Sequence, residues 1–160
     1  MSGLGAETGA LLVVTAAARA CAIPLKHVAE TMRPLRIEPV AGTPRFVRGV
    51  SVIRGAPTPV IDLGKLLDRG GPTADFGRFV TLKVGERRVA VGVDGVVGVW
   101  RPDTDELVEV PFILRDVDAD MIEAIGARDA KLLVVLSAAR LLPDEVWATL
   151  AATLAPGAPA

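Results

Sequence analysis

The sequence predicts an all-β protein with barrel-like or sandwich packing, and three observations favour this class. Short runs of β-branched and apolar residues recur along most of the chain. Glycine- and proline-containing turns separate these runs at close spacing, and few segments have a helical pattern. With 160 residues, of which 51% are apolar and 23% charged, the chain can bury one core, or form two small halves that share a core.

The N-terminal residues predict a hairpin after a frayed start. Residues 1–9 contain three glycines and no hydrophobic periodicity. Residues 11–15 predict a buried strand, and residues 20–25 predict its partner across a turn at residues 17–19. Pro24 lacks a backbone N–H, so we expect the end of the second strand to lie at a sheet edge.

A short helix and a second hairpin are predicted next. Residues 26–33 have apolar positions spaced by four and three, and Pro34 would end a helix there. Residues 46–53 and 58–63 are apolar or β-branched, and the turn-forming residues 54–57 separate them. We therefore expect the order helix, strand, turn and strand.

A third hairpin is predicted between residues 79–84 and 87–93, which flank Gly85-Glu86. Glycine at the first position of a two-residue loop is typical of a type II′ turn. The second of these strands alternates large and small residues, which suits a tightly curved sheet. Asp94-Gly95 predicts a further hairpin turn or a bulge, because residues 96–100 resume the strand pattern.

The C-terminal part predicts two last strands, at residues 107–110 and 132–136, and a helix near residues 143–154. Pro143 suits the first helical position, and the acidic residues directly after it complement the helix dipole.

The predicted elements form a single domain over residues 10–155. The loop at residues 68–75, which contains two glycines and a proline, marks the expected boundary between two barrel halves. Residues 1–9 and the tail at residues 156–160 are expected to be flexible.

Charge and residue types argue against several classes of function. A net charge of −1 provides no basic excess for nucleic acid or for a polybasic membrane surface. One cysteine (Cys21) and one histidine (His27) can form neither an internal disulfide nor a structural zinc site. Without a spanning or signal segment, we expect a cytoplasmic protein that uses no metal or other cofactor.

No combination of residues predicts catalysis. His27 is the only imidazole base, and no nucleophile motif accompanies it. Cys21 lies between two alanines in a strand and is expected to be a small buried side chain. The acidic groups at residues 103–106 and 116–120 lie in polar stretches, so we expect solvated loops rather than catalytic carboxylates.

Two charges stand out among apolar neighbours. Glu30 lies in the predicted short helix, and Arg54 lies between Ile53 and Gly55. An arginine in such a run either extends to solvent or is paired. We predict a buried or half-buried bidentate ion pair between Glu30 and Arg54, with separately solvated side chains as the alternative.

Several blocks occur together in one order, among them Phe46-Val47-Arg48-Gly49-Val50, Ile53-Arg54-Gly55 and Pro59-Val60-Ile61-Asp62-Leu63. Others lie at residues 23–30, 89–97, 132–136 and 140–142. In these blocks the sequence resembles the CheW family of bacterial chemotaxis adaptors, over about residues 10–145.

The resemblance implies two five-stranded SH3-like β-barrel subdomains around a shared core, and no enzymatic activity. It also implies an adaptor that couples the cytoplasmic tips of methyl-accepting chemoreceptors to the regulatory domain of a CheA-type histidine kinase. Such an adaptor is cytoplasmic and is recruited to membrane-associated receptor arrays.

The resemblance further implies a set of receptor-contact positions. They correspond to Val28, Glu30, Gly49, Arg54, Gly55, Phe79 and Val96. An apolar groove between two barrels can hold a receptor's helical hairpin. Gly49 and Gly55 would let backbone approach closely.

Two positions depart from the family pattern, and two other interpretations stay open. Val52 stands where the family usually has Asn, and Ala124 stands where it commonly has Gly, so either could alter the receptor-facing groove. The alternatives are a module similar to the CheA regulatory domain, and an SH3-like binding module of a chemosensory system that does not control motility.

Overall fold

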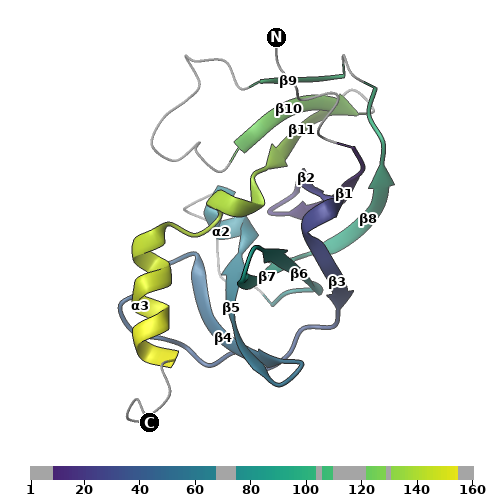
Figure 1. Cartoon of the computed structure of the whole chain (residues 1–160). Coiled ribbons are helices and arrows are strands. Elements are labelled where there is room, and N and C mark those ends of the chain that lie inside the picture. The colour runs from purple at the N-terminus through teal and green to yellow at the C-terminus, as the bar shows by residue number, and fades with distance from the viewer. Residues whose placement is uncertain (1–8, 68–74, 104–105, 110–121, 129–130, 155–160) are drawn as a thin grey trace.

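The computed structural model describes residues 9–67, 75–103, 106–109, 122–128 and 131–154, and β-strands make up most of this part (Figure 1). The all-β class is therefore confirmed. The strands are β1 (Leu11–Ala16), β2 (Arg19–Pro24), β3 (Val28–Met32), β4 (Val47–Ile53), β5 (Ala56–Asp62), β6 (Arg78–Val84), β7 (Arg87–Val93), β8 (Gly95–Trp100), β9 (Leu107–Glu109), β10 (Ile122–Arg128) and β11 (Lys131–Leu136). The helical elements are η1 (Leu25–His27), α2 (Leu63–Leu67), η4 (Ala138–Arg140) and α3 (Asp144–Leu154).

The described strands form two sheets. The first has the order β8-β1-β2-β11-β10-β9, and the second has the order β3-β6-β7-β5-β4. Each sheet contains one parallel pair, β2 with β11 and β5 with β7. The resemblance implied five strands in each unit, whereas the first sheet has six, because the chain leaves the second sheet after β7 and continues as β8, which pairs with β1 (Figure 1).

The segment at Asp94 connects the two sheets, so the predicted hairpin turn or bulge at Asp94-Gly95 is wrong. β7 ends at Val93 in the second sheet, and β8 begins at Gly95 in the first. The Asp94 N–H donates to the carbonyl oxygen of Thr15 at 2.8 Å. A strand pattern that resumes after two residues is compatible with either a hairpin or a crossing, and here the crossing joins the two units.

The core has three parts because several strands are buried on both faces. On β1, Leu12 and Val14 face the large cluster that both sheets share, whereas Leu11 and Val13 face a smaller cluster with Leu133 and other residues of the first sheet. The third cluster lies inside the second sheet and contains Ile53, Val60, Phe79 and Ala90. Continuous apolar runs such as residues 11–14 follow from this two-sided burial.

The predicted helix at residues 26–33 is wrong. Only Leu25–His27 is helical, and the following residues form β3, which pairs with β6. Along β3, Val28, Glu30 and Met32 are half-buried and alternate with two exposed residues, which is the period of a strand. A spacing of four between Val28 and Met32 fits both a helix and a strand. Pairing with β6 therefore determines that this segment is a strand.

Pro24 lies at an end of β2 that has no partner on the β11 side, as expected, although β2 itself is not an edge strand. β2 lies inside its sheet, between β1 and β11. The pairing with β11 involves only Cys21 and Ala22, so Pro24, the last residue of β2, lies beyond the region where a donor would be needed on that side.

The C-terminal helix was predicted close to its observed place. Val146 and Leu150 of α3 are buried in the shared core, and Trp147 packs beside them. Ala151, the residue after Leu150, is exposed. Arg87 at the start of β7 holds the helix, since its guanidinium lies 5.0 Å from the Trp147 ring centroid and 2.9 Å from the Asp144 carboxylate.

The turn between β1 and β2 uses alanines in an unfavourable conformation. Ala17 and Ala18 have φ values of 50° and 60°, and their neighbours Ala16 and Arg19 pair across the hairpin. Positive φ at both central residues is the geometry of a type I′ turn, which favours Asn and Gly.

Ala18→Gly is therefore expected to stabilise the chain by about 0.5–1 kcal/mol, since relief of left-handed strain exceeds the added unfolded-state entropy. Ala18 is exposed and loses no buried contact. Urea melts measure the difference. As a control, Ala148→Gly at an exposed position of helix α3 should destabilise by about 0.5–1 kcal/mol. Destabilisation by both substitutions would contradict the turn assignment.

None of the helices in the described part of the chain has the length and apolar character needed to span a bilayer.

Candidate functional site

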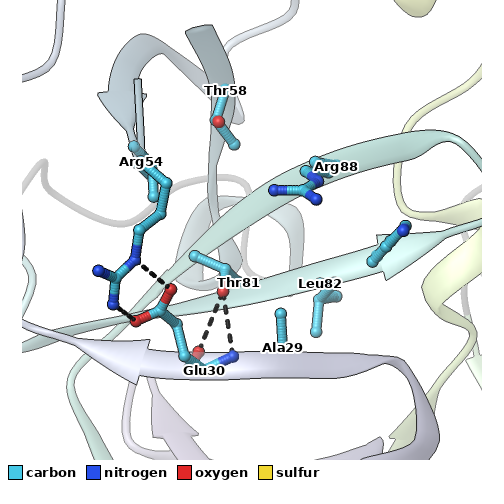
Figure 2. Close-up of a pocket in the computed structure, with 9 residues that line it drawn as sticks. Ala29, Glu30, Arg54, Thr58, Thr81, Leu82 and Arg88 are labelled. Atoms are coloured by element: carbon cyan, nitrogen blue, oxygen red, sulfur yellow. Dashed lines mark hydrogen bonds and ion pairs between the residues drawn. The ribbon is translucent and has the colours of Figure 1, made fainter. Parts of the chain in front are cut away.

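The side chains of Glu30 and Arg54 meet where the five-stranded sheet closes on itself. β3 and β4 are the two edges of this sheet. Arg54 follows β4 directly and donates from Nε to Glu30 Oε2 at 3.0 Å and from Nη2 to Glu30 Oε1 at 2.7 Å (Figure 2). This bidentate ion pair joins two edges that are not paired by backbone hydrogen bonds. We call the place where Glu30 and Arg54 meet the seam.

A β-bulge aims Glu30 at the seam. The register of β3 against β6 shifts between Val28, which pairs with Leu82, and Glu30, which pairs with Thr81. The Thr81 hydroxyl supplies bonds at this irregular point: Oγ1 accepts from the Glu30 N–H and donates to the Glu30 carbonyl oxygen, both at 3.2 Å. Bulges commonly redirect side chains at functional edges. Sequence reasoning missed Thr81, although a polar residue within an apolar strand was a usable signal.

The turn between β4 and β5 presents Arg54. Ile53 and Ala56 pair across the turn, and the two residues between them have positive φ, 53° for Arg54 and 79° for Gly55. This is again the geometry of a type I′ turn. Gly55 suits it, whereas an arginine in the left-handed region is strained. Arg54 thus has a strained backbone, and its side chain reaches Glu30 on β3.

The ion pair is more exposed than the sequence suggested. The Arg54 side chain is 70% exposed and the Glu30 side chain 31%. The Arg54 guanidinium, which hydrogen-bonds both carboxylate oxygens, lowers the pKa of Glu30 below its ordinary value of 4.5, and the same hydrogen bonds raise the pKa of Arg54. The bidentate geometry matches the expectation, but the expected buried or half-buried position does not hold for Arg54.

The exposure predicts only a small effect of this pair on stability. Glu30→Gln and Arg54→Gln should each lower the free energy of unfolding slightly, and the double variant should lose less than the sum of the two. Because the Glu30 pKa is lowered in the folded state, its contribution is present above pH 4.5 and is lost as the pH falls through the lowered value. Urea melts from neutral to acid pH measure this. Strictly additive losses, or a difference from wild type that grows on acidification, would contradict the pairing.

The other positions that the resemblance implied as receptor contacts do not all reach the seam. Gly55 is exposed beside Arg54, and Val28 is half-buried at the start of β3. Val96 is 37% exposed, but it lies on β8 in the other sheet. The structure therefore joins Glu30 and Arg54 directly and places Gly55 next to them, without bringing Val96 into the same cluster.

Two of the positions do not fit a direct contact, because they are buried. Phe79 is 0% exposed and packs with Ile53, Val60 and Ala90 inside the second sheet. Gly49 is buried under the chain segment that carries Glu38, where a Cβ would collide with the Glu38 carbonyl oxygen. The predicted close approach at Gly49 is therefore made by the chain itself.

The departures from the family pattern fall in different places. Val52 lies on β4, is 65% exposed and precedes the turn that carries Arg54. Its side chain is therefore exposed two residues before Arg54. Ala124 lies on β10 of the other sheet.

Cys21 and His27 occupy separate places in the fold. Burial raises the pKa of the Cys21 thiol to about 11, with Arg19 opposing the shift, so the thiol is protonated at neutral pH. His27 is half-buried in η1. Within the described ranges, no group of three or more His, Cys, Asp or Glu residues could hold a metal ion.

A second charged group lies within the fold and has a structural role. Asp62 accepts from Arg48 Nη1 at 3.1 Å and from the Lys65 backbone N–H at 3.0 Å, which caps α2. The Arg48 guanidinium also lies 4.9 Å from the Phe76 ring centroid. This group ties β4, β5 and α2 together.

Comparison with known protein families decides the classification. A family model described as "CheW-like domain" matches residues 10–146. The chain belongs to this CheW-like family. The residues that match the family model therefore include strands of both sheets and reach the start of α3.

Individual relatives of this CheW-like chain agree with the classification. "Chemotaxis protein CheW" of Klebsiella aerogenes is 29% identical over 110 residues, which cover 68% of this chain and 66% of that protein. "Chemotaxis protein CheW" of Treponema pallidum is 22% identical over 128 residues, covering 77% and 75%.

A solved structure has the same fold. The "scaffolding protein TtCheW" of Thermoanaerobacter tengcongensis matches with a TM-score of 0.71 and 23% identity, over 81% of this chain and 89% of that one. The CheW-like fold inferred from the sequence is thereby confirmed.

Proposed function

We propose that this chain is a non-enzymatic adaptor that couples chemoreceptor tips to the regulatory domain of a CheA-type histidine kinase. Membership of the CheW-like family and relatives named as chemotaxis proteins support the proposal. In a cell, the adaptor acts in the cytoplasm and is recruited to receptor arrays at the membrane.

The observation that carries the proposal is the exposed ion pair at the seam. Its two side chains come from the opposite edges of one sheet, so the pair has a fixed geometry and still faces solvent. A fixed and exposed bidentate pair can bind polar groups of a docked helix, and Val52, which is exposed two residues before Arg54, adds apolar surface. We assign the receptor contact to the seam and its surroundings.

Pull-down experiments against three baits test the proposal: a receptor cytoplasmic fragment, the kinase regulatory domain and generic nucleic acid. The unaltered chain should bind the first two baits and not the third. Arg54→Ala and Glu30→Ala should weaken receptor binding and leave kinase binding intact.

A second exposed ion pair gives a matched control for these variants. Arg36 and Glu38 lie 2.9 Å apart, with side chains 86% and 64% exposed. Arg36→Ala should change neither interaction. Binding to neither protein bait by the unaltered chain would contradict the proposed function, and equal weakening by Arg36→Ala would contradict the assignment of the receptor contact to the seam.

A further inference from the structure

A pocket of about 90 Å³ lies next to the seam (Figure 2). Ile53 and Leu82 contribute apolar atoms to its lining, and Thr58 and Thr81 contribute hydroxyl-bearing side chains. The charged residues around it are Glu30, Arg54, Lys83 and Arg88. The pocket therefore combines apolar walls with three cations and one carboxylate.

Lys83 and Arg88 form an unusual pair in this lining. They are direct register partners on β6 and β7, and both are exposed. Like charges directly opposite each other on neighbouring strands destabilise a sheet. In the part of the chain that the structure describes, no hydrogen bond or ion pair compensates either side chain.

The one carboxylate at the pocket is already engaged. Both oxygens of Glu30 accept hydrogen bonds from Arg54. The carboxylate thus balances Arg54 and leaves the charges of Lys83 and Arg88 in excess. A further acceptor with a negative charge would pair with these two donors and relieve their mutual repulsion.

We propose that this pocket binds the carboxylate of an aspartate or glutamate side chain on the partner that docks at the seam. The inference rests on the proposed function, in which that partner is a receptor tip. The pocket is small, and its apolar walls suit the methylene stem of an acidic side chain, while Lys83 and Arg88 pair with the carboxylate. The acidic side chain of the partner thus makes a second contact, with Lys83 and Arg88, beside the contact at the Glu30–Arg54 pair. This second contact increases the specificity of binding.

Charge-reversal variants test the proposal by the affinity for a purified receptor fragment. Lys83→Glu and Arg88→Glu should each weaken receptor binding by about tenfold or more, as expected for loss of a charge-assisted contact. Binding of the kinase regulatory domain should not change. Arg19→Glu, at an exposed residue of the other sheet, is the matched control and should leave receptor binding unaltered.

Two further measurements distinguish a binding role from a structural one. Lys83→Ala should not lower the urea midpoint, because the variant removes a cross-strand repulsion. One acidic residue of the receptor fragment, changed to lysine, should restore binding of Arg88→Glu.

The possible contrary results separate the pocket assignment from the proposed function. Unchanged receptor binding by both reversal variants would overturn the pocket assignment alone, as would a loss confined to kinase binding. Competition by millimolar inorganic phosphate without rescue by any receptor variant would show a free anion site instead. Failure of the unaltered chain to bind the receptor fragment would overturn the proposed function, and the inference with it.

Discussion

Gly49→Ala is expected to destabilise the folded chain by about 3 kcal/mol or more, from backbone strain together with lost hydrogen bonds. Gly49 has a φ of 143°, and an added Cβ would collide with the backbone of Glu38. The segment at Glu38 cannot move away freely, because Glu38 and Val50 exchange two backbone hydrogen bonds of 2.8 Å. Urea melts give the loss in free energy of unfolding.

Gly55→Ala is the matched control for this prediction. Gly55 also has a positive φ, 79°, but nothing lies within 4 Å of its added Cβ. This variant should therefore lose only the free energy that a left-handed backbone costs an alanine, about 1–2 kcal/mol of unfolding free energy. Equal losses for the two glycines would show that contact with Glu38 contributes nothing, and would contradict our explanation of Gly49.

Phe79→Ala should destabilise the chain by about 3–5 kcal/mol, as is typical of a large aromatic removed from a core. The ring is fully buried, and the Phe76 ring meets it edge-on with centroids 6.0 Å apart. Phe79→Leu keeps most of the apolar volume and should lose much less. Thermal or urea unfolding of the two variants measures the difference.

The same substitutions separate folding from binding. Because Phe79 offers no surface to a partner, Phe79→Leu should bind the receptor fragment with unchanged affinity once folded. Reduced affinity in a variant of near wild-type stability would support the contact that the resemblance implied and contradict its assignment to the core.

Local signals predicted the β6–β7 hairpin well. Gly85 has a φ of 61°, and Val84 and Arg87 pair across the turn, in agreement with the predicted type II′ hairpin. Here one residue determines the turn, and the turn determines the register of both strands. This turn signal lies in two adjacent residues, so it can be recognised from the sequence without knowledge of distant contacts.

Other elements depend on distant partners and were missed for that reason. β10 contains few large apolar residues, and at Gly126 a Cβ would lie 2.6 Å from the Leu107 side chain. At Gly126 the neighbouring side chain of Leu107 fills the space, so a small residue stands there, and a pattern of large apolar residues therefore did not reveal the strand.

The candidate site was predicted in part. The charges of Glu30 and Arg54 within apolar surroundings indicated their pairing, whereas the position of the pair depends on how the sheet closes. Thr81, Lys83 and Arg88 join the site only through the register of β3, β6 and β7. No local pattern indicates this register, since β3 itself had a helical spacing.

If this chain links a receptor to a kinase as proposed, a single bead experiment should show it. A receptor cytoplasmic fragment is immobilised, and the kinase regulatory domain is added with and without the chain. We expect the kinase domain to be retained only when the chain is present, and Arg54→Ala to reduce the retention of both proteins together. Equal retention without the chain, or retention of the chain without the kinase domain, would contradict the claim.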